Sequence, residues 1–380
     1  MCPVAIRTSR SSQALETGNA KLWMLLVGIN HYQDEQLTTL RYSAFDCQGL
    51  GNALMAATQA FPQKEVHIHH DFSEQPPHLS TVRASLEHIV ATAASQDTVL
   101  LYFSGHGVLE PSHQQAVLCL TDTYRDKLLE TGLPLSELLR QLASCAAHQQ
   151  IVWLDTCHSG DLTLRGARGA AKLAEVLPNP TPQLVDLLRQ RAAQSKGFYA
   201  LLSCDQTQRS WEFPELGHGV FTYFLMRGLR GEAADAQGVI EADGLYKYVY
   251  YQTLQYVDKT NQQIRLVNQQ RSSRSDQQLQ SEYPLQTPKR IVEGIGELVL
   301  GVRSPSTPPK YPRQALIIEG LANHQTPLEL SKVIRSLGAF ELEYLPRPGC
   351  DWENLRQTIQ TFLACQPEDE VLPAAAPVVA

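Results

Sequence analysis

The chain has 380 residues, of which 43% are hydrophobic and 19% are charged, and its 32 basic and 39 acidic side chains give a formal net charge of -7. This composition is typical of a globular protein with a substantial core, and it excludes a disordered chain or a disulfide scaffold. The negative balance provides no basic field for duplex DNA or anionic lipid, so neither nucleic acid nor a membrane is expected as a partner.

The N-terminal segment and the cysteines favour a cytoplasmic protein. Residues 1–20 contain arginines but no apolar signal segment, and the longest apolar run, Leu22 to Ile29, is too short to span a bilayer. The eight cysteines are scattered and form no CxxC pair, so they predict neither a zinc ribbon nor a thioredoxin-type centre. We therefore expect a reducing cytoplasmic environment and a flexible N-terminal tail over residues 1–20.

From Lys21 onward, short apolar runs alternate with amphipathic stretches. The predicted strands are residues 22–30, 66–70, 98–103, 116–120, 151–155 and 198–203, and the predicted helices are residues 43–60, 79–94 and 134–147. Runs that are apolar at every position indicate strands buried on both faces of a mostly parallel sheet. The pattern predicts an α/β doubly wound fold, in which catalytic groups lie beyond the carboxyl ends of the strands.

The segment 161–196 interrupts this pattern. It contains Pro and Ala, a possible short helix at 185–193, and six basic against three acidic side chains. Connections of this length in compact domains are usually functional or mobile. Two helical patterns follow, at 219–229 and 245–257, and the Gln- and Ser-rich stretch 261–284 is predicted to be a linker or a solvated arm.

A Pro-rich linker, residues 304–312, marks the clearest domain boundary. It separates a large domain, residues 21–303, from a segment that has the pattern strand, helix, strand, helix. This pattern predicts a small α/β accessory domain over residues 313–370, followed by a low-complexity tail, residues 371–380.

Two of the predicted strands lead into reactive residues. One is followed by Ser104, Gly105, His106 and Gly107, and the other leads into Cys157. Catalysis by a thiolate needs a histidine that can take the proton of the cysteine, and glycines that allow a substrate backbone to approach. His106 precedes Cys157 by 51 residues, close to the roughly 50 residues between these groups in caspases.

The chain resembles the caspase-like cysteine peptidases of clan CD, and among them the metacaspase and bacterial orthocaspase branch. The motifs FSGHG and LDTCHSG carry the resemblance, together with VGINHY, LRYSAFD, LLSC, HGVFTYFL and the QTP of residues 286–288. The similarity covers residues 21–300. It implies a caspase-hemoglobinase fold with His106 and Cys157 as the catalytic dyad.

The dyad predicts an acyl-enzyme mechanism. The thiolate of Cys157 attacks the scissile carbonyl, His106 protonates the leaving amine, and water hydrolyses the acyl-enzyme. The backbone N–H groups of Gly107 and Cys157 are the expected oxyanion donors. His158 is an alternative base, but neighbouring residues at a strand end point in different directions. We interpret His218, at the start of a helix, as structural, and no third triad member is evident.

The residues around the dyad predict an anionic S1 subsite, whereas caspases that cleave after Asp need a cationic one. By resemblance to metacaspases, Asp46 and Asp155 line S1 with help from Ser43 and Ser104. This set would select protein or peptide substrates with Arg or Lys at P1. Taken alone, Asp46 also suits a carboxylate at a helix N-terminus, whereas Asp155 at a buried strand end needs a partner.

No metal or other cofactor is predicted. Calcium-dependent metacaspases carry an acidic cluster after the strand that corresponds to AVLCLTD, but here only Asp122 and Asp126 are present, too few for a hard cation. The group His67, His69 and His70 has the spacing of metal ligands but no carboxylate frame, and we interpret it as a solvated strand edge.

The basic segment 161–196 is predicted to be an autoprocessing loop, cut first after Arg165 or Arg168. It begins a few residues beyond Cys157, so its effective concentration at the dyad is high, and glycines follow both arginines. The later candidates are Arg189, Arg191 and Lys196.

Two alternatives remain open. A legumain- or separase-like peptidase would share the His and Cys motifs and prefer another P1 residue. A signalling scaffold would use the C-terminal domain to bind a protein partner and keep the peptidase fold as a vestigial platform, although the intact dyad favours an enzyme. A panel of peptide substrates distinguishes the first alternative, and covalent labelling of Cys157 the second.

Overall fold

The computed structural model describes most of the chain as two compact units, residues 1–310 and 311–380. The described residues are 20–59, 61, 63–158, 179–195, 197–206, 208–236, 238–273, 279–292, 299–302, 313–318 and 340–345, together with Arg356 and Ile359. Within these residues no helix has both the length and the apolar character needed to cross a membrane.

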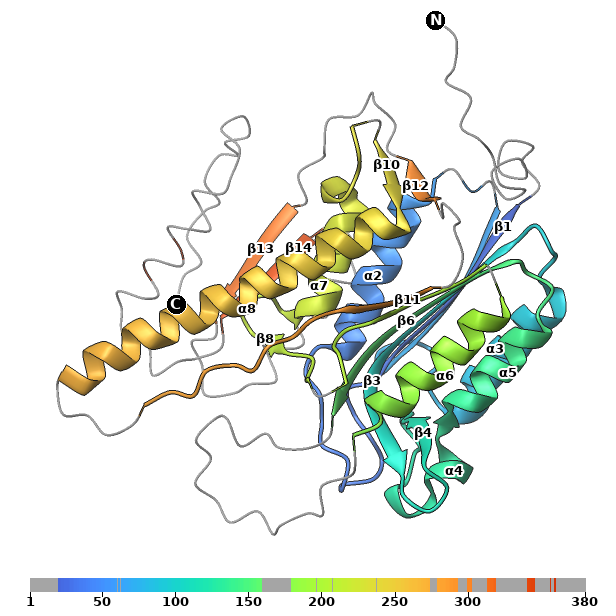
Figure 1. The fold of residues 1–380 in the computed structure, drawn as a ribbon, viewed down its shortest axis with the longest axis horizontal. Coiled ribbons are helices and arrows are strands. Elements are labelled where there is room, and N and C mark those ends of the chain that lie inside the picture. Colours follow the sequence, from blue (N-terminus) through green and yellow to red (C-terminus); the bar gives the residue numbers. More distant parts are fainter. Residues whose placement is uncertain are drawn as a thin grey trace, which may run out of the picture. The chain divides into compact units, whose positions relative to one another are not determined.

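A mixed eight-stranded sheet forms the centre of the first unit (Figure 1). Six strands lie in the order β11-β7-β6-β3-β1-β2, and β4 and β5 extend it beside β3. Their bounds are β1 (Lys21–Gly28), β2 (Gln63–His70), β3 (Thr98–Glu110), β4 (Gln115–Leu118), β5 (Leu133–Pro134), β6 (Gln149–His158), β7 (Phe198–Leu202) and β11 (Lys289–Val292). Strands β2, β1, β3, β6 and β7 are parallel, and β11 is antiparallel. The predicted α/β sheet is therefore confirmed.

Helices cover both faces of this sheet (Figure 1). On one face lie α3 (Leu79–Thr92), α5 (Leu135–Ser144) and α6 (Thr181–Gln194), and on the other lie α2 (Ser43–Ala57), α7 (Val220–Arg227) and α8 (Ala242–Ser273). The short elements are α4 (Leu128–Thr131), η1 (Arg125–Lys127), η2 (Gly228–Glu232), the pair β8 (Glu212–Phe213) and β9 (His218–Gly219), and the pair β10 (Val239–Glu241) and β12 (Val299–Val302).

The apolar runs form strands because both of their faces are buried. In β1, Trp23 and Leu25 belong to the hydrophobic cluster on the side of α3, α5 and α6, whereas Met24 and Leu26 belong to the cluster on the side of α2 and α7. Successive side chains of a strand point to opposite faces, so a strand covered on both sides is apolar at every position.

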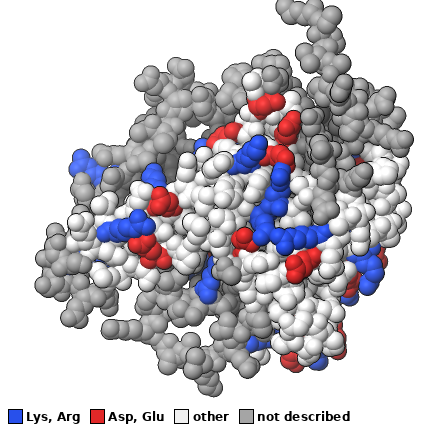
Figure 2. Space-filling view, viewed as in Figure 1, with Lys and Arg blue, Asp and Glu red and all other residues white. Residues whose placement is uncertain are grey.

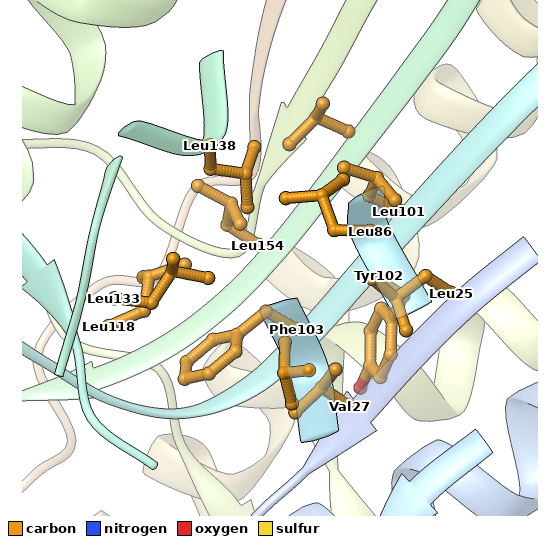
Figure 3. A pocket seen from close by; sticks show the side chains of 12 residues that line it. Leu25, Val27, Leu86, Leu101, Tyr102, Phe103, Leu118, Leu133, Leu138 and Leu154 are labelled. Atoms are coloured by element: carbon orange, nitrogen blue, oxygen red, sulfur yellow. The ribbon is translucent and has the colours of Figure 1, made fainter. Parts of the chain in front are cut away.

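A small apolar cavity of about 20 Å³ lies between the sheet and helices α3 and α5. Figure 3 shows that its lining is almost entirely aliphatic and aromatic carbon, including Leu86, Leu101 and Leu154. A space of this size holds about one water molecule and offers it few polar partners. We therefore regard it as a packing defect of the core and not as a ligand site.

Acidic and basic side chains are intermixed on the face that Figure 2 shows. Among the described residues as a whole, oppositely charged side chains form ion pairs, such as Arg265 with Glu282 at 2.8 Å and Arg83 with Glu137 at 2.7 Å. On the face in Figure 2, acidic side chains also adjoin the group of basic side chains near its centre.

Strands β3 and β6 are longer than the sequence predicts. The apolar runs indicate ends at residues 103 and 155, but β3 continues to Glu110 and β6 to His158. The extension of β3 is stabilised by antiparallel pairing with β4, from Gly107 opposite Leu118 onward. The reactive residues thus lie inside the extended strands and not in loops that follow them.

The stretch 261–284, predicted to be a linker or a solvated arm, is largely exposed, but its first half is helical and is not an irregular linker. Helix α8 continues to Ser273, and the segment from residue 279 runs back along it (Figure 1). Asn261 Nδ2 donates to the Tyr283 carbonyl at 2.8 Å, and Asn268 Nδ2 donates to the Gln280 carbonyl at 2.8 Å. Gln and Arg are good helix formers. The helix is also held by side-chain hydrogen bonds to the returning segment, and composition does not reveal these long-range contacts.

Part of the predicted autoprocessing loop is also a helix. Residues 181–194 form α6, which packs on the sheet. Arg191 is buried, and its Nη2 donates to Gln150 Oε1 at 2.8 Å. This residue is therefore inaccessible to a protease, and its prediction as a cleavage site is wrong. Arg165, Arg168 and Lys196 lie outside the described residues.

The second unit contains two parallel strands, β13 (Arg313–Ile318) and β14 (Phe340–Leu345). They coincide with the two strands predicted there. The helices predicted between and after them lie almost entirely outside the described residues, where only Arg356 and Ile359 are described as helical.

Candidate functional site

The parallel pairing of β3 and β6 brings the two candidate catalytic positions together. His106 is the register partner of Cys157, and two residues earlier Ser104 is the register partner of Asp155. Adjacent strands lie about 4.8 Å apart. Residues far apart in the chain therefore become neighbours because the connection through α5 returns β6 alongside β3.

His106 is buried and is held on three sides. Its Nε2–H donates to the Thr38 carbonyl at 2.6 Å, and its backbone N–H donates to Tyr32 Oη at 2.8 Å. The rings of Tyr32 and His106 are stacked with centroids 4.9 Å apart. Because a carbonyl only accepts, Nε2 carries the proton in the neutral imidazole, and Nδ1 is the nitrogen that can take one. The Thr38 carbonyl thus orients the imidazole, a role for which the sequence shows no candidate.

The segment between β1 and α2 provides Tyr32 and Thr38, and its motifs secure it locally. Asn30 Oδ1 accepts from the Ala44 N–H at 2.9 Å, and Asn30 Nδ2 donates to the Arg41 carbonyl at 3.0 Å. A Cβ at Gly28 would lie 2.3 Å from the Ser43 carbonyl oxygen. Glycine at that position lets the first turn of α2 approach the end of β1 closely.

Asp46 is buried in the first turn of α2 and accepts hydrogen bonds from a distant segment. His218 Nδ1 lies 2.7 Å from Asp46 Oδ1, and the Gly219 N–H donates to Asp46 Oδ2 at 3.1 Å. The interpretation of His218 as a structural residue at a helix start is therefore incomplete. It lies just before α7, but its ring holds a candidate substrate-binding carboxylate.

Asp155 is buried at the carboxyl end of β6. Ser210 Oγ donates to its Oδ1 and Thr222 Oγ1 to its Oδ2, both at 2.7 Å. Burial raises the pKa of Asp155, although these hydroxyl bonds act in the opposite direction. Gln286, from the QTP motif, donates from Nε2 to Ser210 Oγ at 3.1 Å and so fixes one of the donors.

The two carboxylates converge above Gly219. A Cβ built on this residue would lie 3.1 Å from Asp46 Oδ2 and 3.2 Å from Asp155 Oδ2. Any larger residue would crowd both oxygens, so glycine keeps this space open. Such a space, bordered by two acidic oxygens, is chemically suited to a cationic group.

The two candidate serines lie beside the carboxylates. Ser43 begins α2, one turn before Asp46, and its buried Oγ has no hydrogen-bond partner among the described residues. Ser104 is buried and hydrogen-bonds to the Tyr102 hydroxyl, which also lies 2.8 Å from Thr222 Oγ1. Asp46, Asp155 and Ser104 therefore belong to one buried polar cluster, and Ser43 is buried one turn before Asp46 in α2.

Glu212 is a third acidic residue that the sequence does not single out. It is the register partner of Gly219 in the β8–β9 pair. Its carboxylate accepts weak bonds from the backbone N–H groups of Arg41 and Tyr42, each at 3.4 Å. Burial is the main cause that raises the pKa of Glu212 to about 7, with Asp155 contributing in the same direction. No local motif marks this residue, because only the pairing of two short strands brings it to the site.

Other candidates lie elsewhere. His69 and His70 are buried, and burial lowers the pKa of both, so their interpretation as a solvated strand edge is wrong. The cause is α3, whose Ser85 Oγ lies 2.8 Å from His69 Nε2. Asp122 accepts from the Leu79 N–H at 2.9 Å and so secures the start of α3.

This sheet, with a histidine and a cysteine in register on its central strands, defines a caspase-type α/β fold. The protein-family model of the caspase domain matches residues 21–281 of the sequence, and the chain therefore belongs to the caspase family. That membership assigns it to the cysteine peptidases.

Similar solved structures include a protein of Geobacter sulfurreducens, with 16% identity over 76% of this chain and 98% of that chain and a TM-score of 0.47. Caspase-1 from Spodoptera frugiperda has 13% identity over 76% of this chain and 92% of its own, with a TM-score of 0.42. The structure of pro-sf-caspase-1 has 12% identity over 74% and 94%, with a TM-score of 0.39. A search of curated protein sequences found no match.

Proposed function

We propose that the chain is a cysteine endopeptidase that cleaves after Arg or Lys through the dyad of His106 and Cys157. The register pairing of these two residues beside two buried carboxylates is the observation that carries the proposal. A dyad alone is compatible with any P1 preference, so the acidic cluster decides the specificity.

His106 acts as the base that activates Cys157. Its Nε2–H is engaged by the Thr38 carbonyl, so Nδ1 takes the thiol proton and later delivers it to the leaving amine. The stacked ring of Tyr32 and its hydroxyl hold the imidazole in place. The carbonyl of Thr38 stabilises the imidazolium that forms, as the carboxylate does in a Ser-His-Asp triad.

The tetrahedral intermediate is stabilised by the backbone N–H groups of Gly107 and Cys157. A Cβ at Gly107 would lie 3.2 Å from Thr156 Cβ and 3.4 Å from Pro180 Cγ. Glycine at this position therefore avoids crowding near the dyad. Loss of one such donor in other hydrolases costs about two to three orders of magnitude in rate.

Asp46 and Asp155 form the base of an S1 subsite for a guanidinium or an ammonium group, with Ser43 and Ser104 as polar neighbours. The donors that contact Asp155 are the neutral hydroxyls of Ser210 and Thr222. A bound cation would supply the countercharge and reverse the effect of burial on its pKa. Arginine suits two converging carboxylates particularly well, because its five donors form a planar fork.

A panel of peptide substrates tests this assignment. Substrates with Arg or Lys at P1 should be cleaved, whereas those with Asp, Asn or citrulline should be poor. Cys157→Ala and His106→Ala should each abolish cleavage, and the double variant should be scarcely slower than either single one. Preference for Asn or Asp would contradict the specificity, and activity of Cys157→Ala would contradict the peptidase assignment.

The segment after Cys157 is the proposed site of autoprocessing, at Arg165 or Arg168, and no calcium is required. Intact mass and denaturing gels of wild type, Cys157→Ala and the double variant Arg165→Ala/Arg168→Ala test this proposal. Equal cutting of wild type and Cys157→Ala would indicate a contaminating protease. An uncut but fully active double-arginine variant would show that cutting does not activate the enzyme.

A further inference from the structure

A second group of reactive side chains lies where the edge strand β2 meets α3. Glu65 Oε1 is 3.0 Å from His67 Nε2 and 3.0 Å from His88 Nε2, and these three atoms all lie within 4.8 Å of one another. Glu65 and His67 are alternate residues of β2 and therefore share a face. His88 comes from α3, so the group joins the strand to the helix.

The atoms in this group are those that zinc prefers. Two imidazole nitrogens and one carboxylate oxygen form a common three-ligand set, with water in the fourth position. At metal–ligand distances of about 2.0 to 2.2 Å, the ligand atoms of a tetrahedral site lie about 3.3 Å apart. The observed separations of Glu65 Oε1 from both Nε2 atoms are close to this value, so small side-chain shifts would admit an ion.

The surroundings hold the ligands in place. Lys21 Nζ binds Glu65 Oε2 at 2.7 Å, so the other oxygen faces the two imidazoles. The ring of Trp23 packs edge-on against His88, with centroids 5.9 Å apart. Such outer contacts orient metal ligands in known sites.

We infer that Glu65, His67 and His88 form a binding site for a zinc ion or a similar divalent transition metal. The side chain of His88 is 51% exposed and that of Glu65 is 32% exposed, so solvent can enter and supply the fourth ligand. From the sequence no metal is predicted, because His67 is considered only together with its chain neighbours His69 and His70. The site proposed here revises that prediction.

The role of this site is structural, because it is remote from the dyad. Trp23 pairs with Glu65 on one side and with Val99 on the other, and His106 lies seven residues beyond Val99 along β3. At ~3.3 Å per residue this is about 23 Å. A metal that binds only the folded chain stabilises it, here by tying an edge strand to the helix that covers it.

Zinc titration of the full chain carrying Cys157→Ala tests the inference, since this background removes the catalytic thiol as a competing ligand. Competition with a chromophoric chelator should reveal a saturable site, and zinc should raise Tm. His67→Ala and His88→Ala should each weaken binding by at least about tenfold to a hundredfold, and they should abolish the rise in Tm. His88 is half exposed on a helix, so its replacement tests the site even if His67→Ala fails to fold.

His113→Ala is the matched control. His113 also lies beside a carboxylate: its Nδ1 is 3.1 Å from Glu110 Oε2, and its side chain is 64% exposed. Among the described residues, however, no third possible metal ligand completes this pair. Its replacement should leave zinc affinity unchanged. Equal affinity in the parent and His88→Ala, or no rise in Tm of the parent with zinc, would overturn the inference.

Discussion

Replacing Asp155 by asparagine removes a charge and preserves the shape of the side chain. Asp155 is 2% exposed and accepts hydrogen bonds from Ser210 and Thr222 at 2.7 Å each. Asparagine can keep both contacts, because its Oδ1 accepts from one hydroxyl and its Nδ2 donates to the other, whose O–H rotates away. The variant therefore isolates the effect of charge on recognition of the P1 residue.

The expected loss is large for arginine and small for its neutral isostere. Removing one partner of a buried charge pair costs about 2 to 5 kcal/mol. At about 1.4 kcal/mol per decade, this is about 30-fold to about 4,000-fold in kcat/KM for a substrate with Arg at P1. Citrulline has almost the same shape as arginine but no charge, so cleavage after citrulline should change by less than about tenfold.

Stability should not fall with activity. Because burial raises the pKa of Asp155, its ionised form is disfavoured in the folded state. The free energy of unfolding therefore decreases as pH rises from the ordinary aspartate pKa of about 3.9 through the raised value. Asparagine carries no such penalty. At neutral pH the Tm of Asp155→Asn should be at least that of wild type.

The assay measures kcat/KM for paired Arg and citrulline peptides, together with Tm. Asp97→Asn is the matched control, because Asp97 is 5% exposed, accepts from Trp23 Nε1 at 2.9 Å, and precedes β3 at the end opposite to the dyad. It should lower Tm and leave the ratio of Arg to citrulline cleavage unchanged. An unchanged ratio in Asp155→Asn would refute the role of this carboxylate in S1.

Three further predictions concern the surroundings of the dyad. Tyr32→Phe keeps the stacked ring but removes the acceptor of the His106 backbone N–H. In steady-state kinetics kcat should fall about tenfold with little change in KM, and an unchanged kcat would contradict this positioning role. Because the pKa of Glu212 is raised to about 7, this side chain becomes charged as pH rises through neutrality. The kcat/KM for Arg substrates should therefore rise over that range in wild type, and less in Glu212→Gln. Identical pH profiles would exclude Glu212 from P1 recognition. Gly219→Ala places a Cβ about 3 Å from both acidic oxygens in a backbone conformation that alanine adopts readily, so KM for Arg substrates should rise at least about fivefold in steady-state kinetics. An unaltered KM would show that P1 binds elsewhere.

Six of the eight strands of the central sheet, and the two positions proposed for catalysis, could be predicted from the sequence alone. Each apolar run between amphipathic stretches forms a strand, because period and hydrophobicity are local properties. His106 and Cys157 were recognisable because each lies at the end of such a run among glycines. Asp46 and Asp155 lie within the same motifs, and so the acidic character of the site could also be predicted.

The tertiary structure alone decided which distant groups support those residues. Thr38 contributes a backbone carbonyl, which no side chain reveals, and Glu212 reaches the site only through a two-residue strand pair. His218 contacts Asp46, which is 172 residues away. Long-range pairing of this kind depends on the packing of whole elements and leaves no periodic trace in the chain.

The same reason explains the errors over polar segments. Composition predicts a linker or solvated arm after residue 260, but it does not reveal that α8 continues there and that its side chains bond to the segment that returns beside it. The spacing of His67, His69 and His70 indicates one cluster, whereas α3 separates them by burying His69 and bringing His88 to His67. Local sequence determines what a segment can form, and the elements packed against it decide which of its polar groups meet.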